Sequence, residues 1–280
     1  MLVLMTGGTG FVGKAAVRRL IADGYRVRVL ARRSANIDPI VRLGAEVSCG
    51  DVADPVSFGQ AFQGCDAVVH LAAGTSGSQN DSQTATLSGT RTLLDLCQQH
   101  KPKRLVYISS CSVYGVADYD VNAVVSETSS LERFPEKRGV YSASKQEAER
   151  YVTDYMKTDD VPVAVLRPGT VYAPGTDLFS GMMGFAVGSV YVVIGTGGFV
   201  LPFVHVDNLA GAISRCLERK EAEGEIFNVI DPERITKRQY VDRVIRRVDP
   251  QARVVYLPYS VMYGITWMQE LAFKLMKRRP

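Results

Sequence analysis

The stretch TGGTGFVG, Thr6 to Gly13, is the feature that most constrains what this chain can fold into. It follows the apolar segment LVLM and precedes a segment with apolar residues at helical spacing that stops at Gly24. Because Gly7, Gly10 and Gly13 have no side chains, the backbone can turn tightly there and approach a pyrophosphate at the N-terminus of the helix. Glycines in this position between a strand and a helix predict a dinucleotide-binding site, whereas a glycine pattern alone would be a weak signal.

The order of the predicted elements indicates the fold class. Six short apolar strands are expected at 2–8, 25–32, 45–51, 66–73, 103–110 and 161–169, with helices between them at 13–24, 37–43, 55–64, 86–100 and 141–157. Strands that alternate with helices indicate βαβ units and a parallel sheet, and right-handed crossovers favour a doubly wound arrangement. We predict an α/β fold with a Rossmann-type doubly wound parallel sheet and a smaller C-terminal substrate-binding lobe.

The pattern changes after Pro168. Residues 169–202 are rich in glycine and aromatic residues and have no clear period. Helices return at 205–219 and 236–248, and strands return at 224–230 and 252–258. We therefore assign residues 1–167 to an NAD(P)-binding Rossmann domain, to which residues 203–230 return, and residues 168–280 mainly to the substrate-binding lobe.

The end of the second predicted strand decides which dinucleotide is expected. In a site selective for NAD, an acid at this point binds the ribose 2′-hydroxyl. Here the strand RVRVL leads into Ala31, Arg32, Arg33 and Ser34, without an acid. Because arginine binds phosphate through its planar guanidinium, Arg32 and Arg33 suit the 2′-phosphate of NADP. We predict NADP rather than NAD, although Arg33 is equally well explained as a solvated surface residue.

Composition and spacing exclude several other classes. A net charge of +4 dispersed over 280 residues is too small to indicate nucleic-acid binding. The five cysteines have no metal-ligand or redox spacing, so we expect reduced thiols in a cytoplasmic protein and no metal site. The chain begins without a signal-peptide pattern, and its longest apolar run, from Met182, is too short and too glycine-rich to span a bilayer.

Seven motifs follow one another along the chain: TGGTGFVG, GDVAD, HLAA, ISSCSVYG, YSASK, RPGTVYAPG and VHVDNLA. In this order they resemble the extended short-chain dehydrogenase/reductase superfamily, often called NAD-dependent epimerase/dehydratases. The resemblance covers essentially residues 1–217. It implies that the chain is an enzyme that uses a nicotinamide cofactor.

The stretch YSASK holds two side chains with complementary chemistry. Tyr141 and Lys145 are four residues apart, which on a helix places both on one face, about 5–6 Å apart at Cβ. The resemblance implies that Tyr141 is the catalytic acid/base, that Lys145 holds the nicotinamide ribose and lowers the tyrosine pKa, and that Ser110 hydrogen-bonds the substrate oxygen. A free tyrosine has a pKa of about 10, so acid/base catalysis near neutral pH needs stabilisation of the phenolate by nearby positive charge.

The same motifs assign the cofactor contacts. Asp51 and Val52 match residues that flank the adenine, and Ala72 and Ala73 match a strand end beside the cofactor. The expected cofactor-binding residues are Gly7, Thr9, Gly10, Phe11, Val12, Gly13, Arg32, Arg33, Asp51, Val52, Leu71, Ala72, Ala73, Tyr141, Lys145, Pro168 and Gly169.

Two histidines fall within these motifs without an assigned chemical role. His70 lies in an apolar strand and is expected to be a buried residue with a hydrogen-bond partner. His205 is expected to be structural as well, with Asp207 capping the helix that follows.

Two positions depart from the family pattern. Thr86 stands where the family commonly has an asparagine, which puts a water or backbone link at the site in doubt. Gly169 and Thr170 stand where nucleotide-sugar enzymes commonly have an asparagine. The second departure resembles the hydroxysteroid-dehydrogenase and dihydroflavonol-reductase-like branches, whose pocket is apolar.

The leading hypothesis is an NAD(P)-dependent oxidoreductase that transfers a hydride between nicotinamide and a secondary alcohol or ketone, on an apolar or mixed substrate. A nucleotide-sugar epimerase or dehydratase is the first alternative, and a non-catalytic dinucleotide-sensing protein is the second. Residues 75–80, 116–138 and 176–202 are expected to line the substrate pocket. Aromatic and methionine side chains there either bind an apolar molecule or form the core of the small lobe. They include Phe179, Met182, Met183, Phe185, Tyr191 and Phe199.

The last residues raise the question of partners besides a small-molecule substrate. Apolar residues recur near helical spacing and are followed by basic residues, namely Ile265, Met268, Leu271, Leu275 and Met276, with Lys274, Lys277, Arg278 and Arg279. We favour packing of the apolar side on the small lobe, with peripheral contact to an anionic membrane surface as the alternative. Relatives often dimerise through helices equivalent to residues 84–99 and 141–156, which makes a homodimer a further hypothesis.

Overall fold

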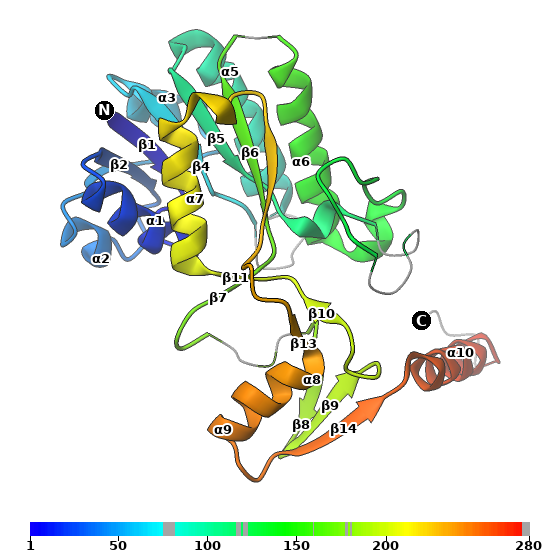
Figure 1. Ribbon diagram of the computed structural model, residues 1–280. Helices are drawn as coiled ribbons and strands as arrows, with labels where there is room; N and C mark the ends of the chain where they lie inside the picture. The colour runs from blue at the N-terminus through cyan, green and yellow to red at the C-terminus, as the bar shows by residue number, and fades with distance from the viewer. Residues whose placement is uncertain are drawn as a thin grey trace. The chain divides into compact units, whose positions relative to one another are not determined.

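The computed structural model describes residues 1–74, 82–115, 119, 123–158, 160–176, 179 and 181–275. Contacts divide the chain into two units, which are described separately (Figure 1). The first unit comprises Met1–Tyr119, Val124–Tyr172 and Phe203–Asp231. The second unit comprises Asp120–Ala123, Ala173–Pro202 and Pro232–Pro280.

A seven-stranded sheet forms the centre of the first unit. Its strands run in the order β12-β6-β5-β4-β1-β2-β3, and every neighbouring pair is parallel. They are β1 (Leu2–Thr6), β2 (Arg26–Ala31), β3 (Glu46–Cys49), β4 (Ala67–His70), β5 (Arg104–Ile108), β6 (Val163–Pro168) and β12 (Ile226–Val229). This order, with the crossover between β3 and β4, is that of a doubly wound Rossmann-type sheet, so the predicted fold class is confirmed.

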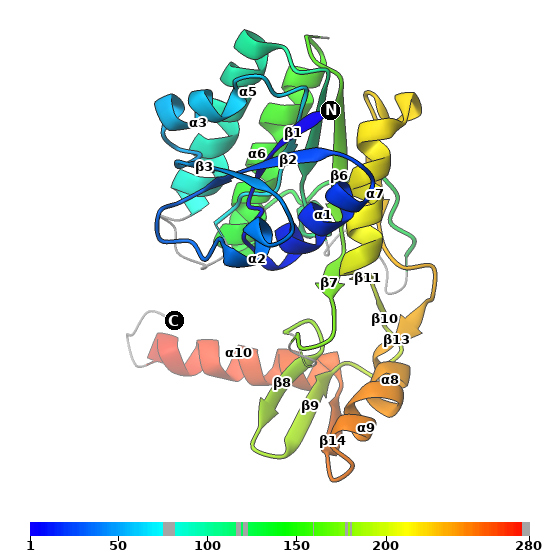
Figure 2. The same ribbon diagram turned by 90° about the vertical axis from the view of Figure 1, so that its left-hand side faces the viewer.

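Helices cover both faces of this sheet (Figure 2). On one face, α1 (Phe11–Ala22) packs against α7 (Val206–Glu218). On the other face, α5 (Gly89–His100) lies between α3 (Pro55–Phe62) and α6 (Val140–Met156). The short helix α2 (Asp38–Val41) follows β2. Both faces of the sheet are therefore covered, which explains why its strands read as continuous apolar runs rather than as alternating patterns.

Local sequence explains where two of these helices begin. The Asp54 carboxylate accepts hydrogen bonds from the backbone N–H groups of Val56 and Ser57, and Pro55 occupies the first helical position, so α3 starts there. Helical structure in the region predicted at 86–100 starts earlier than predicted. A π-helical segment, Ser82–Ser88, leads directly into α5.

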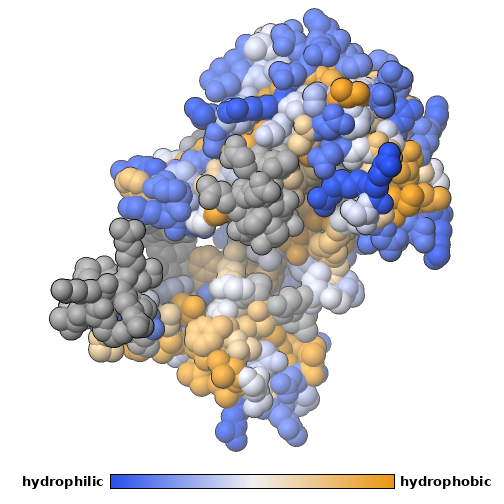
Figure 3. Space-filling view, turned by 180° about the vertical axis from the view of Figure 1, so that it is seen from behind, coloured by the Kyte–Doolittle hydropathy of each residue, from blue (hydrophilic) through white to orange (hydrophobic). Residues whose placement is uncertain are grey.

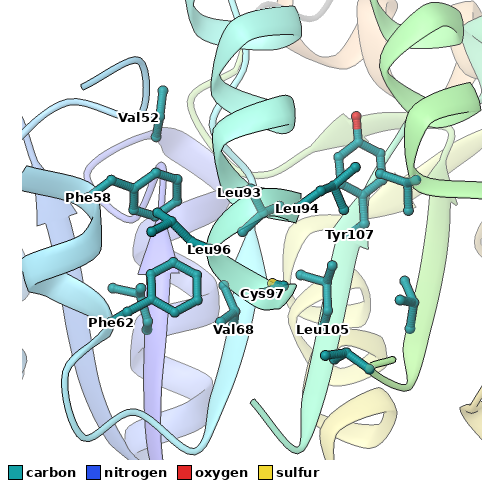
Figure 4. Packing of buried hydrophobic residues seen from close by; sticks show 14 of the residues in the cluster. Val52, Phe58, Phe62, Val68, Leu93, Leu94, Leu96, Cys97, Leu105 and Tyr107 are labelled. Atoms are coloured by element: carbon teal, nitrogen blue, oxygen red, sulfur yellow. The ribbon is translucent and has the colours of Figure 1, made fainter. Parts of the chain in front are cut away.

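The hydrophobic core of the first unit lies between the sheet and α3, α5 and α6 (Figure 4). Phe58 and Phe62 of α3 pack with ring centroids 5.3 Å apart, next to Leu96 of α5. Leu105 and Tyr107 of β5 are fully buried in the same cluster. Removing apolar surface from water stabilises the fold by about 25 cal/mol per Å², so this packing holds the helices against the sheet.

The strand register gathers several motifs at one edge of the sheet. Thr6 pairs with His70, His70 pairs with Tyr107, and Ile108 pairs with Leu166. Because these strands are parallel, their carboxyl ends meet at the same edge, where open α/β sheets bind their ligands. The glycine loop and the HLAA, ISSCSVYG and RPG motifs all leave the sheet here.

Two short strands continue the first unit beyond this edge. β7 (Thr170–Tyr172) pairs in parallel with β11 (Phe203–His205). The Asp231 carboxylate accepts hydrogen bonds from the backbone N–H of His205, from Asn208 and from the Tyr172 hydroxyl. The Asp231 carboxylate therefore fixes the segment at which the chain returns to the first unit.

The described residues of the second unit form a three-stranded sheet, a two-stranded sheet and four helical segments. β9 (Val190–Ile194) lies between antiparallel β8 (Gly184–Val187) and parallel β14 (Arg253–Leu257), while β10 (Val200–Leu201) pairs with β13 (Ile235–Thr236). The run predicted as one helix at 236–248 consists of α8 (Lys237–Tyr240), a π-helical segment (Val241–Ile245) and α9 (Arg246–Val248). The helix α10 spans Tyr259–Leu275. In the part of the chain that the structure describes, no helix combines the length and hydropathy needed to cross a membrane.

Candidate active site

The glycine loop between β1 and α1 has a backbone that admits only small residues. Gly7 has φ +70°, a backbone conformation that favours glycine. It also lies close to the chain after β4, because a Cβ on Gly7 would be 2.9 Å from the amide nitrogen of Ala72. A Cβ on Gly13 would lie 2.1 Å from the Gly7 carbonyl oxygen, which in turn accepts a hydrogen bond from the Gly10 N–H at 3.1 Å. The loop is therefore wound tightly onto the start of α1.

This arrangement leaves the N-terminus of α1 available to an anion. Gly10 occupies the N-cap position and supplies no side-chain hydrogen bond to the first turn. The first N–H groups of a helix have no partner within the helix, and together with the helix dipole they attract negative charge. Phe11, Val12 and Gly13 supply these N–H groups, so this part of the chain fits the pyrophosphate of a dinucleotide.

Arg32 and Arg33 follow β2 at the same edge of the sheet. Thr6 of β1 pairs with Leu30 of β2, so the residues after Ala31 lie beside the glycine loop. Both arginine side chains are exposed. Their position after β2 is the one that contacts the adenosine ribose in dinucleotide-binding sheets.

The segments after β3 and β4 are held by their own hydrogen bonds. Asp51 accepts from the Ala53 N–H at 2.9 Å and closes a turn, while Val52 is buried in the core. The Ala72 N–H donates to the Thr6 hydroxyl at 3.1 Å, which fixes the start of the Leu71–Ala73 segment. These contacts hold the backbone at the predicted adenine and nicotinamide sides of the site.

Thr86, which stands where the family commonly has an asparagine, is attached to the chain after β4. Its hydroxyl accepts a hydrogen bond from the Gly74 N–H at 2.9 Å, and the residue is buried. The π-helical segment before α5 is thereby attached to the chain after β4.

The three predicted catalytic residues lie together. Ser110 follows β5, and its hydroxyl accepts a hydrogen bond from the Ser112 N–H at 3.1 Å, capping a short 3₁₀ helix (Cys111–Val113). The Ser110 side chain lies close enough to the Tyr141 hydroxyl to lower the pKa of that hydroxyl. Lys145, one turn further along α6, is buried, and its Nζ donates to the Ile108 carbonyl oxygen at 2.8 Å. The end of β5 and the residues that follow it therefore lie beside both members of the Tyr–Lys pair.

The pKa values of this group differ from the simple expectation. Burial raises the pKa of Tyr141 above its ordinary value, and the hydrogen bond from Ser110 lowers it only in part. Burial lowers the pKa of Lys145 to about 8, against the opposing effect of the Glu149 carboxylate. Lys145 therefore remains mostly protonated at neutral pH. The Lys145 ammonium is directed to the Ile108 carbonyl oxygen, and its lowering of the tyrosine pKa stays a prediction.

A buried polar network that the sequence analysis did not single out supports these residues. Glu149 is one turn beyond Lys145 on α6 and forms an ion pair with Arg167 of β6, with N–O distances of 2.5 to 3.2 Å. Arg167 also donates to the Tyr114 hydroxyl at 2.6 Å, and that hydroxyl donates to Asn228 of β12 at 2.7 Å. Two sequence signals point to this pair: the spacing from Lys145 to Glu149, and a lone charge at the end of the apolar strand VAVLRP.

The network also fixes the segment that carries Ser110. The Cys111 thiol donates to the Arg167 carbonyl oxygen at 3.1 Å, and Arg138 donates to the Tyr114 carbonyl oxygen at 3.0 Å. These bonds tie the residues on both sides of the 3₁₀ helix to β6 and to the start of α6. Because a buried charge must be paired, this network specifies one arrangement of the two elements.

His70 lies beneath the site and is neutral. Its Nδ1 is 3.0 Å from the Thr6 hydroxyl, and its ring stacks on Tyr107 with centroids 5.8 Å apart. Burial, with a further contribution from Lys145, lowers the pKa of His70 to about 3. His70 therefore serves packing and the Thr6 link through Nδ1, whereas its buried Nε2 has no hydrogen-bond partner among the described residues.

The expectation that Asp207 caps α7 is wrong. His205 occupies the N-cap position, and its Nδ1 accepts a hydrogen bond from the Asp207 N–H at 3.3 Å. Asp207 lies in the first turn and pairs instead with Arg18 of α1, with an N–O distance of 2.5 Å. An imidazole nitrogen can accept the free N–H as a carboxylate would, which leaves the aspartate for the neighbouring helix.

The expected pocket-lining segments are only partly described. Residues 75–80 lie outside the described residues, as do 116–118, 120–122, 177, 178 and 180. Of the six aromatic and methionine residues predicted for the lobe, Met183 is fully buried, and Phe179 and Tyr191 pack edge to face at 5.1 Å. Phe185 is exposed, and the Lys237 ammonium lies 5.6 Å from the Phe199 ring centroid. Core packing therefore accounts for part of this set.

Comparison with known proteins identifies the family. The family model described as "NAD dependent epimerase/dehydratase family" matches residues 3–229. The chain belongs to this family. It is an enzyme of the extended short-chain dehydrogenase/reductase type, and this family binds NAD(P).

Relatives of this epimerase/dehydratase family member differ in activity. The chain is 26% identical to the Arabidopsis thaliana protein named 3beta-hydroxysteroid-dehydrogenase/decarboxylase isoform 1, covering 98% of this chain and 67% of that protein. It is 25% identical to the 2-alkyl-3-oxoalkanoate reductase of Shewanella oneidensis, covering 98% and 73%. The crystal structure of a Thermus thermophilus UDP-glucose 4-epimerase in complex with NAD is similar, with 25% identity, a TM-score of 0.73 and coverage of 94% and 93%.

Proposed function

We propose that this chain is an NADP(H)-dependent oxidoreductase that transfers a hydride between the nicotinamide and a secondary alcohol or ketone on an apolar or mixed substrate. The observation that carries the proposal is the grouping of three side chains: Ser110 lies beside Tyr141, and buried Lys145 lies one turn along the same helix as Tyr141. This group lies at the sheet edge where the glycine loop begins. When bound, the nicotinamide cofactor supplies or accepts the hydride.

The chain's own residues handle the proton and the developing charge. Tyr141 donates a proton to the oxygen of a ketone, or accepts one from an alcohol. Ser110 donates a hydrogen bond to the same oxygen and stabilises the charge that develops on it. Lys145, mostly protonated at neutral pH because its pKa is about 8, holds positive charge next to the phenol and binds the ribose hydroxyls.

The preference for NADP rests on the end of β2. Arg32 and Arg33 are exposed at this point, and no acid stands there to bind a ribose 2′-hydroxyl. Two guanidinium groups complement a 2′-phosphate. Arg32→Ala is expected to raise KM for NADPH at least ten-fold more than KM for NADH, whereas Arg42→Ala, which removes an exposed arginine after α2, serves as the matched control. A wild-type preference for NADH contradicts the assignment.

The substrate class rests on two observations. Gly169 and Thr170 leave the end of β6 without the asparagine that nucleotide-sugar enzymes commonly carry there. The two curated relatives described above are named for a hydroxysteroid and for an oxoalkanoate, and both names describe an oxygen on a carbon chain or ring rather than a nucleotide sugar. We therefore favour an apolar alcohol or ketone.

Nucleotide-sugar epimerisation is the second candidate, because a UDP-glucose 4-epimerase shares the fold over 94% of this chain. The two candidates differ in cofactor turnover, since an epimerase reduces and reoxidises its cofactor within one cycle. Oxidation of NADPH should therefore be followed by absorbance with a panel of hydroxysteroids, 3-oxoalkanoates and UDP-sugars. Net NADPH oxidation with a ketone supports the oxidoreductase, whereas interconversion of UDP-sugars without net turnover overturns it. A protein that binds NADPH but turns over no member of either class would favour the sensing role.

A further inference from the structure

Large exposed apolar side chains are concentrated in the second unit. Of the 21 large hydrophobic residues that are exposed in the described part of the chain, eleven belong to this unit, although it holds 83 of the 280 residues. Part of this surface is visible as an orange area at the bottom of Figure 3. Exposed apolar side chains that gather on one part of a protein indicate an interaction site.

The helix α10 carries five of these eleven residues. Tyr259, Val261, Tyr263, Trp267 and Met268 are 53%, 46%, 75%, 57% and 59% exposed. The sequence favours packing of this helix on the small lobe, but the side chains of Val261, Trp267 and Met268 lie in solvent. Tyrosine and tryptophan have an apolar ring and a polar group, a combination that is enriched where water meets a lipid bilayer.

The second unit is also the basic part of the chain. Its segments hold eleven Lys and Arg against six Asp and Glu, a net charge of +5, whereas the remaining segments hold 22 against 23, a net charge of −1. The sequence from Tyr259 onward contains one acid, Glu270, and four bases: Lys274, Lys277, Arg278 and Arg279. The positive charge therefore follows directly upon the exposed apolar helix.

We propose that α10 and the basic residues that follow it bind the surface of an anionic lipid bilayer. Apolar and aromatic side chains with adjacent lysine and arginine are the combination that holds a helix in the plane of such a surface. The positive charge of the second unit favours a membrane over a protein partner. A bilayer with anionic headgroups complements this charge, whereas a neutral apolar protein surface does not. This proposal goes beyond the proposed catalytic function and does not depend on it.

The chain offers its own reporter for this interaction. Trp267 is the single tryptophan among the 280 residues, so intrinsic tryptophan fluorescence reports the environment of α10 alone. The full chain should be mixed with vesicles of phosphatidylcholine alone or of phosphatidylcholine with phosphatidylglycerol, and its emission and co-sedimentation measured. We expect a shift of the emission to shorter wavelength and co-sedimentation with the anionic vesicles only, both reduced by added salt.

Two pairs of variants separate apolar insertion from charge. Met268→Glu is expected to abolish co-sedimentation, whereas Val248→Glu, at a residue 67% exposed in the same unit, leaves it unchanged. Replacing Lys277 and Arg278 by serine is expected to lower the partition coefficient about ten-fold or more, because each basic residue near the surface contributes on the order of 1 kcal/mol. Replacing Arg246 and Arg247 by serine is the matched control.

Three outcomes overturn the proposal. The first is that the protein stays in the supernatant with both kinds of vesicle, and the second is that it binds both kinds equally. The third is that Trp267 emission lies at short wavelength without vesicles and does not respond to them, which means that protein covers the helix. Dependence of that emission on protein concentration would identify the cover as a second copy of the chain.

Discussion

Glu149 of α6 and Arg167 of β6 form an ion pair that is almost completely buried, with side chains 1% and 4% exposed. Glu149 lies one helical turn beyond Lys145, and Arg167 precedes Pro168, the last residue of β6. The pair therefore joins the helix with the Tyr–Lys residues to the strand beside the site. Through Tyr114 it also holds the segment that follows Ser110.

Replacing only one member of this ion pair should lower the free energy of unfolding. Arg167→Met leaves the Glu149 carboxylate buried without its partner, so we expect the free energy of unfolding to fall by about 3–5 kcal/mol. Urea denaturation followed by circular dichroism measures this. Lys157→Met provides the matched control, because it breaks the exposed pair with Asp154 and should cost less than about 1 kcal/mol.

Removing both charges separates pairing from packing. The double variant Arg167→Met with Glu149→Met removes the buried charges together, and we expect it to recover most of the stability that Arg167→Met loses. If the double variant is as unstable as the sum of the two single variants, the pair does not account for the loss.

Tyr141→Phe tests the acid/base assignment. The substitution removes only the hydroxyl that lies beside Ser110. We therefore expect NADPH to stabilise the variant as it does the wild type. In contrast, kcat on a ketone substrate should fall about 100-fold to 10,000-fold. Tyr151→Phe removes a hydroxyl from the same helix, where it pairs with Arg91 and Glu147, and should change kcat little. Turnover by Tyr141→Phe at the wild-type rate would exclude this tyrosine as the proton donor.

His70 should contribute to acid sensitivity. Its pKa is about 3 in the folded chain and 6.5 as the ordinary value. Between pH 6.5 and pH 3, His70 is therefore protonated in the unfolded chain and neutral in the folded chain. The free energy of unfolding consequently decreases as the pH falls from 6.5 toward 3. At about pH 5 this amounts to about 2 kcal/mol, given 1.36 kcal/mol for each pH unit.

A variant isolates this effect from that of the carboxylates. His70→Gln should lose less stability than the wild type between about pH 7.5 and about pH 5, by about 2 kcal/mol in urea denaturation. His100→Gln, which replaces an exposed histidine at the end of α5, is the control. Parallel pH profiles for the wild type and His70→Gln would show that His70 takes up a proton in the folded chain.

Gly13→Ala tests the cradle for the pyrophosphate. The added methyl would lie 2.1 Å from the Gly7 carbonyl oxygen, so the glycine loop must move away from α1. We expect loss of the thermal stabilisation by NADPH and destabilisation of about 1–3 kcal/mol. Gly181→Ala adds a methyl where no atom lies within 4 Å and should leave both quantities unchanged. Normal NADPH binding by Gly13→Ala would show that the cofactor does not use this loop.

Much of the fold and the cofactor edge can be predicted from the sequence because their signals are local. The glycine loop, the alternation of strands and helices, and the spacing from Tyr141 to Lys145 each lie within a few turns of chain. The cap of α7 could not be predicted with the same certainty. Which of His205 and Asp207 takes the free N–H depends on Arg18, which comes from a helix almost 190 residues earlier.

The sequence by itself determined the class of the sheet and the family motifs, and it predicts which residues have the chemistry for proton transfer. Only the tertiary structure decided how those residues are paired. It turned Lys145 toward the Ile108 carbonyl, raised the pKa of Tyr141, and placed Arg167 against Glu149. The physical reason is that burial and partner choice depend on which distant segments meet across the parallel sheet, and spacing along the chain carries no information about desolvation.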